Sequence, residues 1–389
     1  MTMPQEADPL DGVALALARE GRVEVEVPSA SAIRRRGPAS REAPVFYNQA
    51  TELGRDASVA VLRAVGREGW RALDGLAGSG VRGIRYAVEG PAGLEVTLND
   101  ADPLAAALCA RNAARNGVAG ARVTNRRLEP MLAEERFDLV DIDPFGSPAR
   151  FLAGGVRAVR RGGILALTAT DTPALCGSTP RPCVRRYGAR PWRGEAMHEV
   201  ALRILLGAVV REAARTDLVA EPVLSMAEDH YVRVFLRVGK GAQRADAVLR
   251  LVGYAWRGED GGVATGPHAP GGPGPWPGPW AGPMWLGPLH DRAVVAALEP
   301  TEHMGTRVRL GRLRELWLEE ADLPPLLVDV NALSGRLHLP TPKMADVIGR
   351  LRDQGFRAGR AHTNPQGIKT DAPMAELGGA IEGLSKRPG

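Results

Sequence analysis

The run Asp141-Ile-Asp-Pro-Phe-Gly-Ser-Pro148 carries the residue types needed to handle an exocyclic amine of a nucleobase. It follows the apolar run 137–140, which we expect to be a buried strand. The Asp143 carboxylate and the Pro144 carbonyl can both accept hydrogen bonds from an –NH2 group, and the Phe145 ring can stack on the ring bearing that amine. A strand that simply ends in an Asp-Pro turn is the alternative, and this run alone does not decide between them.

A glycine loop lies upstream of that run. A short strand is expected to end near Asp74, and Gly78 and Gly80 then lead into a helix. Glycines let the backbone approach a ligand closely and adopt φ values that other residues avoid. A second strand, 94–99, is followed by Asp100, roughly twenty residues after the loop, which suits a carboxylate that binds a pair of ribose hydroxyls.

The order of these segments narrows the class of reaction that the protein could catalyse. NAD-dependent dehydrogenases share the glycine loop, but a later strand ending in Asp-Pro-Phe-Gly favours a methyltransferase that uses S-adenosylmethionine on an amine. S-adenosylmethionine is therefore the expected cofactor, and S-adenosylhomocysteine the product. Asp74, Gly78, Gly80 and Asp100 are the residues expected beside it.

Size and composition point to a protein of the cytoplasm. The 389 residues predict two domains, and 44% hydrophobic content is ordinary for a globular protein. The sequence has no apolar run near the roughly 20 residues of a membrane span, and its N-terminus does not resemble a signal peptide. Three cysteines predict neither a disulfide framework nor a four-ligand metal cage; they are Cys109, Cys176 and Cys183.

The positive charge is carried almost entirely by arginine. The net charge is +5, and lysine occurs only at 240, 343, 369 and 386. This balance permits a polyanionic partner, and arginine offers a bidentate fork for phosphate. A GC-rich genome or a heat-adapted host explains the arginine bias equally well.

The elements that must position these residues alternate between strand and helix from about 72 to 238. We expect a doubly wound, mostly parallel sheet, with helices over 55–65 and 198–214. The segment 230–238 alternates cleanly, which is typical of an antiparallel or edge strand. Residues 258–287 are dominated by glycine and proline, and we expect no regular structure there, only a link that tryptophans pack down.

A smaller α+β unit is expected beyond this link. It would contain a short helix at 322–337, an amphipathic helix at 341–355 capped by Thr341, and a strand at 356–362. Helix, helix, strand and turn make a winged-helix-like module, a type that often touches nucleic acid. His362 and Lys369 would contact phosphate there or simply be exposed.

The ordered motifs of nearly the whole chain resemble the tRNA (guanine-26-N2)-dimethyltransferase family, which has a class I methyltransferase domain with a Rossmann-like doubly wound sheet and its own C-terminal domain. The segments that carry the resemblance include Val45-Phe-Tyr-Asn48, Gly80-Val-Arg-Gly-Ile-Arg85, Leu98-Asn-Asp100, Asp141 to Pro148, Thr168-Ala-Thr-Asp171, Asp229-His-Tyr231, Trp285-Leu-Gly-Pro-Leu289 and Gly367-Ile-Lys-Thr-Asp-Ala-Pro373.

The resemblance implies roles at the cofactor. Arg55 and Arg82 would hold the methionine carboxylate of S-adenosylmethionine, and Asp100 would bind the ribose hydroxyls. The family places an acidic residue at the adenine amine, whereas this chain has arginines in the run 124–130. The backbone around Leu128 is therefore the expected adenine contact.

The resemblance also implies roles at the base. Phe46 and Phe145 would sandwich a flipped guanine, and Asp143, with the carbonyl of Pro144, would act on its N2 amine. The implied partner is tRNA, with guanosine 26 converted to N2,N2-dimethylguanosine. The link has no cysteines, so no metal is expected, and nothing in the sequence demands more than a monomer.

The resemblance implies three regions. Residues 1–240 would form the methyltransferase domain, with an N-terminal extension over about 1–50. Residues 241–288 would be an insert or linker, and 289–389 a tRNA-binding domain.

Duller interpretations stand beside these. Phe46 and Phe145 have an alternative interpretation as core aromatics, which is favoured for Phe46 when the resemblance is set aside. Arg55 is alternatively part of a solvated helix face, and Asp100 a helix cap. An amine methyltransferase for another RNA or a DNA base is the alternative function. An RNA-binding protein without turnover is a further one.

Overall fold

The computed structural model describes residues 9–29, 44–118, 120–228, 230–267 and 278–385. The chain forms two compact units. The first contains 1–144, 157–167 and 297–312, and the second contains 145–156, 168–296 and 313–389.

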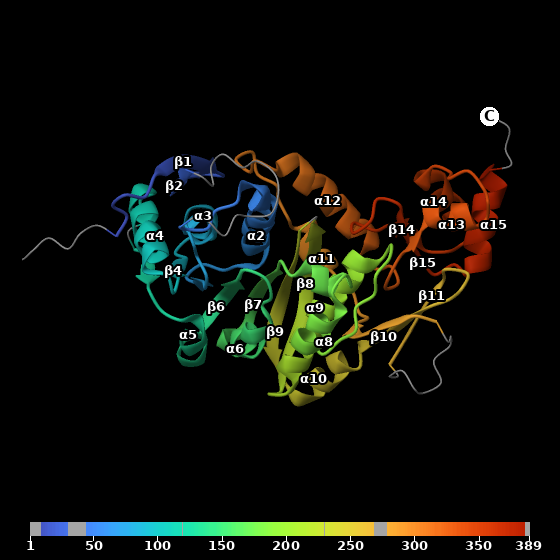
Figure 1. The fold of residues 1–389 in the computed structure, drawn as a ribbon, viewed down its shortest axis with the longest axis horizontal. Helices are drawn as coiled ribbons and strands as arrows, with labels where there is room; N and C mark the ends of the chain where they lie inside the picture. The colour runs from blue at the N-terminus through green and yellow to red at the C-terminus, as the bar shows by residue number, and fades with distance from the viewer. Residues whose placement is uncertain (1–8, 30–43, 119, 229, 268–277, 386–389) are drawn as a thin grey trace, which may run out of the picture. The chain divides into compact units, whose positions relative to one another are not determined.

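A seven-stranded mixed sheet organises the fold, in the order β5-β4-β3-β6-β7-β9-β8 (Figure 1). Its strands are β3 (Arg71–Asp74), β4 (Glu95–Asn99), β5 (Arg122–Thr124), β6 (Phe137–Ile142), β7 (Val159–Ala169), β8 (Leu218–Glu228) and β9 (Tyr231–Lys240). The first five pair in parallel, whereas β9 pairs with β8 antiparallel. This confirms the expected mostly parallel sheet and the antiparallel direction predicted from the alternation of β9.

Helices connect the parallel strands: α3 (Val81–Glu89), α4 (Pro103–Arg115), α5 (Leu128–Glu134) and α6 (Leu152–Ala158), the last preceded by the 3-10 turn η2 (Ala149–Phe151). The 3-10 turn η1 (Gln49–Thr51) and helix α2 (Glu52–Val65) come before the first of these strands. The start of α4 follows from its sequence, because the Asp102 carboxylate accepts the Leu104 N–H at 2.9 Å and Pro103 occupies the first turn. The long apolar helix expected at 198–214 is confirmed as α9 (Met197–Ala214).

An N-terminal hairpin packs on α4. It pairs β1 (Leu15–Glu20) with β2 (Val23–Pro28), and the Asn112 side chain bridges to the Glu26 backbone through bonds of 2.7 and 2.9 Å. The alternating run Val23-Glu-Val-Glu-Val27 is typical of a strand and accounts for β2, whereas β1 was not expected from the sequence.

The expectation that 258–287 forms no regular structure is wrong. A three-stranded antiparallel sheet joins β10 (Val252–Arg257) to β11 (Val263–Gly266) and β12 (Trp280–Trp285). Pro283 is tolerated because β12 is an edge strand of the order β11-β10-β12, where a missing N–H costs no ladder bond. Residues 268–277, and Trp276 with them, lie outside the described residues.

Short helices complete this part of the second unit. They are α7 (Thr172–Leu175), α8 (Pro180–Tyr187), α10 (Ala242–Leu249) and α11 (Arg292–Ala296).

The C-terminal module contains the expected helix, helix, strand and turn in that order, together with two strands and a final helix that were not expected. Its elements are β13 (Val328–Asp329), α13 (Val330–Arg336), α14 (Met344–Asp353), β14 (Ala358–Arg360), β15 (Gly367–Thr370) and α15 (Met374–Ser385), which follow α12 (Arg307–Glu320). Figure 1 shows α13, α14 and α15 gathered around the small sheet, and their shared core includes Val330, Val347, Leu351, Ile368 and Leu377.

Two boundaries differ from those expected. Helix α14 begins at Met344 after Lys343, so Thr341 is not its cap. The Thr341 hydroxyl instead bonds the Asn331 side chain at 2.8 Å. The helix expected at 322–337 begins only at Val330, because 328–329 pair with β15. Among the described residues, no helix combines the length and apolar character needed to cross a membrane.

Candidate active site

The site is built where the strand order reverses. Chain order runs outward from β3 through β4 to β5 in one direction, and from β6 to β7 in the other. Asp74 is the last residue of β3 and lies opposite Asp141 of β6. Ligands of doubly wound sheets bind at the carboxyl ends of strands at such a switch point. Asp74 and Asp143 therefore come from the two strands that flank it.

The glycine loop after β3 has a backbone that requires glycine. Gly78 has φ +54°, and Gly80, which precedes the first turn of α3, has φ +79°. A Cβ on Gly78 would lie 3.0 Å from the Phe46 carbonyl oxygen, and one on Gly80 would lie 3.1 Å from the Cys109 sulfur. Both positions combine left-handed backbone with close approach, as the sequence predicted for a loop that borders a ligand.

Asp100 lies against this loop. Its carboxylate accepts the Gly78 N–H at 2.9 Å and the Asp102 N–H at 3.0 Å. Partial burial raises the pKa of Asp100, and the backbone donors work against that rise. Each carboxylate oxygen accepts more than one hydrogen bond, so acceptor capacity remains for ribose hydroxyls. Asp100 precedes the helix cap, which is Asp102.

Arg82 connects the two strand ends. Its side chain is buried and forms an ion pair with Asp143, and Nη1 donates to the Ser58 hydroxyl at 3.0 Å. Its Nε lies 3.9 Å from an Asp141 oxygen. Burial alone would lower the pKa of Arg82, but Asp141 and Asp143 raise it well above its usual range. This guanidinium therefore stays charged and fixes the Asp143 carboxylate.

Asp74 is buried and carries a perturbed carboxyl. Burial raises the pKa of Asp74 to about 7, and the neighbouring Asp141 adds to the rise. The Gly83 N–H donates to its Oδ2 at 2.9 Å. Asp74 therefore fastens the first turns of α3 to the end of β3.

Arg55 forms an ion pair with a residue that was not expected from the sequence to be its partner. It is buried and forms an ion pair with Glu20 of β1, with Nε 2.7 Å from Oε2, and it also donates to Thr51 Oγ1 at 2.6 Å. Burial raises the pKa of Glu20, but Arg55 outweighs this and keeps it below the usual range. Arg55 is thus not on a solvated helix face. Because β1 was not recognised, no sequence signal pointed to Glu20.

The remaining predicted residues are placed as follows. Phe46 is partly buried in the first unit, and Leu128, the first residue of α5, is buried there. Leu128 borders the glycine turn, because a Cβ on Gly75 would lie 3.0 Å from its Cδ1. Pro144 is buried, whereas Phe145, in the second unit, is 58% exposed. Phe145 is therefore not a core aromatic.

Within the second unit, hydrogen bonds at Gly146 and at Ser147 hold the loop that carries Phe145. The Gly146 N–H donates to Thr170 Oγ1 at 2.8 Å, and the Thr170 N–H donates to the Gly146 carbonyl at 2.9 Å. The Ser147 hydroxyl bonds the Tyr187 hydroxyl at 2.7 Å, which in turn donates to Asp171 at 2.7 Å. This network fixes the loop while leaving the Phe145 ring exposed.

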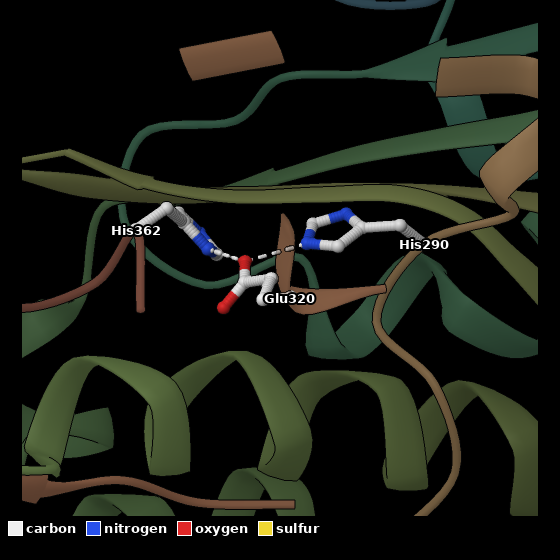
Figure 2. Close-up of side chains that lie close together, drawn as sticks. All are labelled: His290, Glu320 and His362. Atoms are coloured by element: carbon white, nitrogen blue, oxygen red, sulfur yellow. Dashed lines mark hydrogen bonds and ion pairs between the residues drawn. The ribbon is translucent and has the colours of Figure 1, made fainter. Parts of the chain in front are cut away.

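His362 and Lys369 are neither exposed nor free to contact phosphate. Both side chains are buried in the second unit around Glu320. Figure 2 shows His362 and His290 directed at Glu320 from opposite sides. His362 Nδ1 and His290 Nε2 both bond Glu320 Oε1, the latter at 2.8 Å. Lys369 Nζ lies 3.0 Å from both Glu320 and Glu199. The small β-sheet carries buried charges here, which an exposed-wing interpretation of the sequence did not predict.

The donor types of this cluster resemble those of a metal site. The ligand atoms of His290, Glu320 and His362 lie within 4.8 Å of one another. However, the Ser225 N–H donates to His290 Nδ1 at 3.4 Å, so a neutral His290 keeps its proton on Nε2, directed at Glu320. Burial lowers the pKa of His290 to about 4, which favours that neutral form. The geometry is that of a hydrogen-bonded carboxylate.

Comparison with known proteins identifies the family of this chain. The family model of N2,N2-dimethylguanosine tRNA methyltransferases matches residues 21–382. The chain belongs to this family. Among relatives, the tRNA (guanine(26)-N(2))-dimethyltransferase of Thermococcus kodakarensis is 38% identical, over 92% of this chain and 97% of its own. The protein of the same name from Natronomonas pharaonis is 40% identical, over 93% and 99%.

A solved structure shares this fold over nearly the whole chain. It is the complex of Trm1 from Pyrococcus horikoshii with S-adenosyl-L-methionine, which is 34% identical with a TM-score of 0.84. The match covers 94% of this chain and 100% of the other. The Rossmann-like sheet and the additional C-terminal module are therefore features of the family fold.

Proposed function

We propose that the protein methylates the exocyclic N2 of guanosine 26 in tRNA, using S-adenosylmethionine, to give N2,N2-dimethylguanosine. The observation that carries this proposal is the carboxylate of Asp143, which follows β6 and is fixed by buried Arg82 of α3, the helix that begins directly after the glycine loop of the neighbouring strand β3. Family membership over residues 21–382 supports the substrate.

The residues around the glycine loop fit the cofactor. Gly78 and Gly80 have left-handed backbone and would bring a Cβ to within 3.0 and 3.1 Å of their neighbours, and Asp100 keeps acceptor capacity beside them. In this proposal Asp100 binds the ribose hydroxyls, the backbone at Leu128 contacts the adenine, and Arg55 and Arg82 hold the methionine carboxylate. Both guanidiniums already have protein partners, so they share donors between those partners and the cofactor.

When bound, S-adenosylmethionine supplies a methyl group activated by its sulfonium centre, and S-adenosylhomocysteine is released. Guanine N2 is a poor nucleophile because its lone pair is delocalised into the ring. Hydrogen bonds from N2 to the Asp143 carboxylate and the Pro144 carbonyl favour the pyramidal nitrogen that can attack. The same carboxylate stabilises the positive charge developing on N2 and accepts its proton.

The base must leave its helix to reach this carboxylate. Flipping costs a few kcal/mol, and stacking on aromatic rings returns about 1–3 kcal/mol per base. We assign this stacking to Phe46 and Phe145. The exposed Phe145 ring on its fixed loop supports the assignment. We further propose that residues 289–389 form a tRNA-binding domain and that the chain acts as a monomer.

The test is methylation of a tRNA transcript with labelled S-adenosylmethionine, followed by mass spectrometry of its nucleosides. We expect N2,N2-dimethylguanosine, lost when guanosine 26 is replaced by adenosine. Asp143→Ala should abolish methylation and leave tRNA affinity nearly unchanged. Label on another base, or on the transcript that lacks guanosine 26, would contradict the proposal.

A further inference from the structure

An open groove of 650 Å³ lies in the second unit between α8 and the edge strand β12. Its size falls within the roughly 300–1,000 Å³ of typical ligand sites. Its lining combines apolar atoms with three arginines and two aromatic rings; these residues include Val184, Tyr254, Pro283, Arg181, Arg185 and Arg190.

The charged side chains that line this groove are all positive. Arg181, Arg185 and Arg190 are exposed, and no carboxylate belongs to its described lining. Arg181 and Arg185 form no ion pair within the described part of the chain. Most other arginines of this unit have partners, such as Arg186 with Asp171 at 3.0 Å. Unpaired guanidiniums at the rim of a groove are suited to phosphate, which they bind bidentately.

An aromatic platform accompanies this charge. Trp280 is partly exposed, and the Arg190 guanidinium lies 4.8 Å from the centre of its ring. Tyr254 meets Trp280 edge to face at 6.1 Å, and paired backbone bonds of 2.8 and 2.9 Å join Arg190 to Gly282. The platform is thus held rigidly. A stacked arginine and indole next to free arginines is the combination that binds unpaired nucleotides, because every base presents a flat face.

The groove is tied to the loop that carries Phe145. Tyr187, the last residue of α8, bonds Ser147, two residues after Phe145. Arg211 holds the same end of the helix by donating to the Tyr187 carbonyl. RNA lying in the groove would therefore lie on the element that positions the exposed ring.

We propose that this groove binds an unpaired nucleotide of the tRNA, outside the helix that holds the target guanosine. Its base stacks on the platform formed by Trp280 and Arg190, and its phosphates are bound by Arg181 and Arg185. This inference rests on the proposed function and names a substrate contact within it. An acidic protein segment would use the charge but not the ring.

The experiment compares the double variant Arg181→Glu/Arg185→Glu with Arg215→Glu/Arg244→Glu, a control with the same charge change at two exposed arginines outside the groove. We expect the groove variant to raise KM for the tRNA transcript at least tenfold and to flatten the salt dependence of tRNA binding. Trp280→Ala should raise KM roughly tenfold, with Trp280→Phe close to wild type. Cofactor affinity should remain that of wild type in every variant, and Tm should remain that of wild type in the arginine variants and in Trp280→Phe.

Equal effects of the groove and control variants would overturn the proposal, because net charge alone would then explain them. A raised KM in the arginine variants with an unchanged KM in Trp280→Ala would assign the surface to an acidic partner instead of a base. Binding of the transcript is measured separately by filter retention with Asp143→Ala. If wild type binds tRNA through the groove but never methylates it, the proposed function fails while the groove stands.

Discussion

At the scale of single residues, the site depends on side chains whose surroundings differ sharply. Arg82 and Asp74 are buried, whereas Phe145 is 58% exposed. An exposed aromatic ring contributes little to folding, since most of its surface stays in water. The loop that carries this ring is instead held by hydrogen bonds at Gly146 and Ser147. Function and stability can therefore be separated at this position.

Phe145→Ala should lower kcat/KM for tRNA roughly 5- to 150-fold, the loss of one base–aromatic stack. Phe145→Tyr should retain most activity. The matched control is Leu17→Ala, which truncates an equally exposed apolar side chain on β1. Steady-state methylation and thermal unfolding check both. An unchanged kcat/KM in Phe145→Ala would remove this ring from the mechanism.

Asp74 predicts an unusual pH dependence of stability. Its folded pKa is about 7 against an ordinary value near 3.8, so the folded state holds a proton that the unfolded state has released. This contribution is present at low pH and is lost as the pH rises from about 4 to 7, by about 4 kcal/mol at most. Asp74→Asn should therefore gain stability relative to wild type as the pH rises across this window, measured by urea unfolding at several pH values. Parallel curves would contradict it.

At the scale of elements, sequence patterns predicted those parts whose residues act locally. The alternation of β9, the apolar run of α9 and the glycine loop before α3 each reflect a periodicity or a backbone requirement. Segments defined by distant partners were missed. Strand β12 depends on pairing with β10, and β1 depends on β2, so neither is visible in composition.

The same reason explains His362 and Lys369. Their buried side chains are paired with Glu320 on α12 and Glu199 on α9, and both carboxylates lie far away in the sequence. Arg55 is similar, because its partner Glu20 comes from β1. The glycine loop before α3 and the strand that ends just before Asp143 could be predicted from the sequence. The partners that orient its surrounding charges could not.

Lys369 joins α9, α12 and β15 by charge, so its removal should be costly. Lys369→Met leaves Glu199 and Glu320 buried with fewer counter-charges, and we expect a loss of about 3–5 kcal/mol in unfolding free energy. Lys343→Met is the matched control, since Lys343 is exposed and makes no side-chain cap. It should change stability by less than about 0.5 kcal/mol. Equal losses in chemical denaturation would refute the buried network.

The His290, Glu320 and His362 group also makes a prediction about metal. If the histidine protons occupy the atoms directed at Glu320, the purified protein should contain far less than one equivalent of zinc by plasma mass spectrometry. A chelator should then leave Tm unchanged. Stoichiometric zinc that is lost in His290→Gln would show that the group is a metal site after all.

At the scale of the whole molecule, stability against pH combines opposing contributions. Burial and then neighbouring charges set the pKa of His290, with burial lowering it to about 4 from 6.5. Between pH 6.5 and about 4, the unfolded chain therefore binds a proton that the folded chain does not bind. This contribution is fully present above about pH 6.5 and is lost as the pH falls toward 4, by about 3 kcal/mol. Asp74 acts in the opposite direction.

Because the two contributions oppose each other, wild-type stability should vary less between pH 4 and 7 than that of either single variant. His290→Gln keeps a donor for Glu320 and an acceptor for Ser225, so its main effect on the pH profile is to remove the titration. Relative to wild type, it should gain stability as the pH falls, while Asp74→Asn should lose it. Urea unfolding of both variants and of the double variant checks this. Two single variants that shift in the same direction would show that one of the two protonation states has been assigned wrongly.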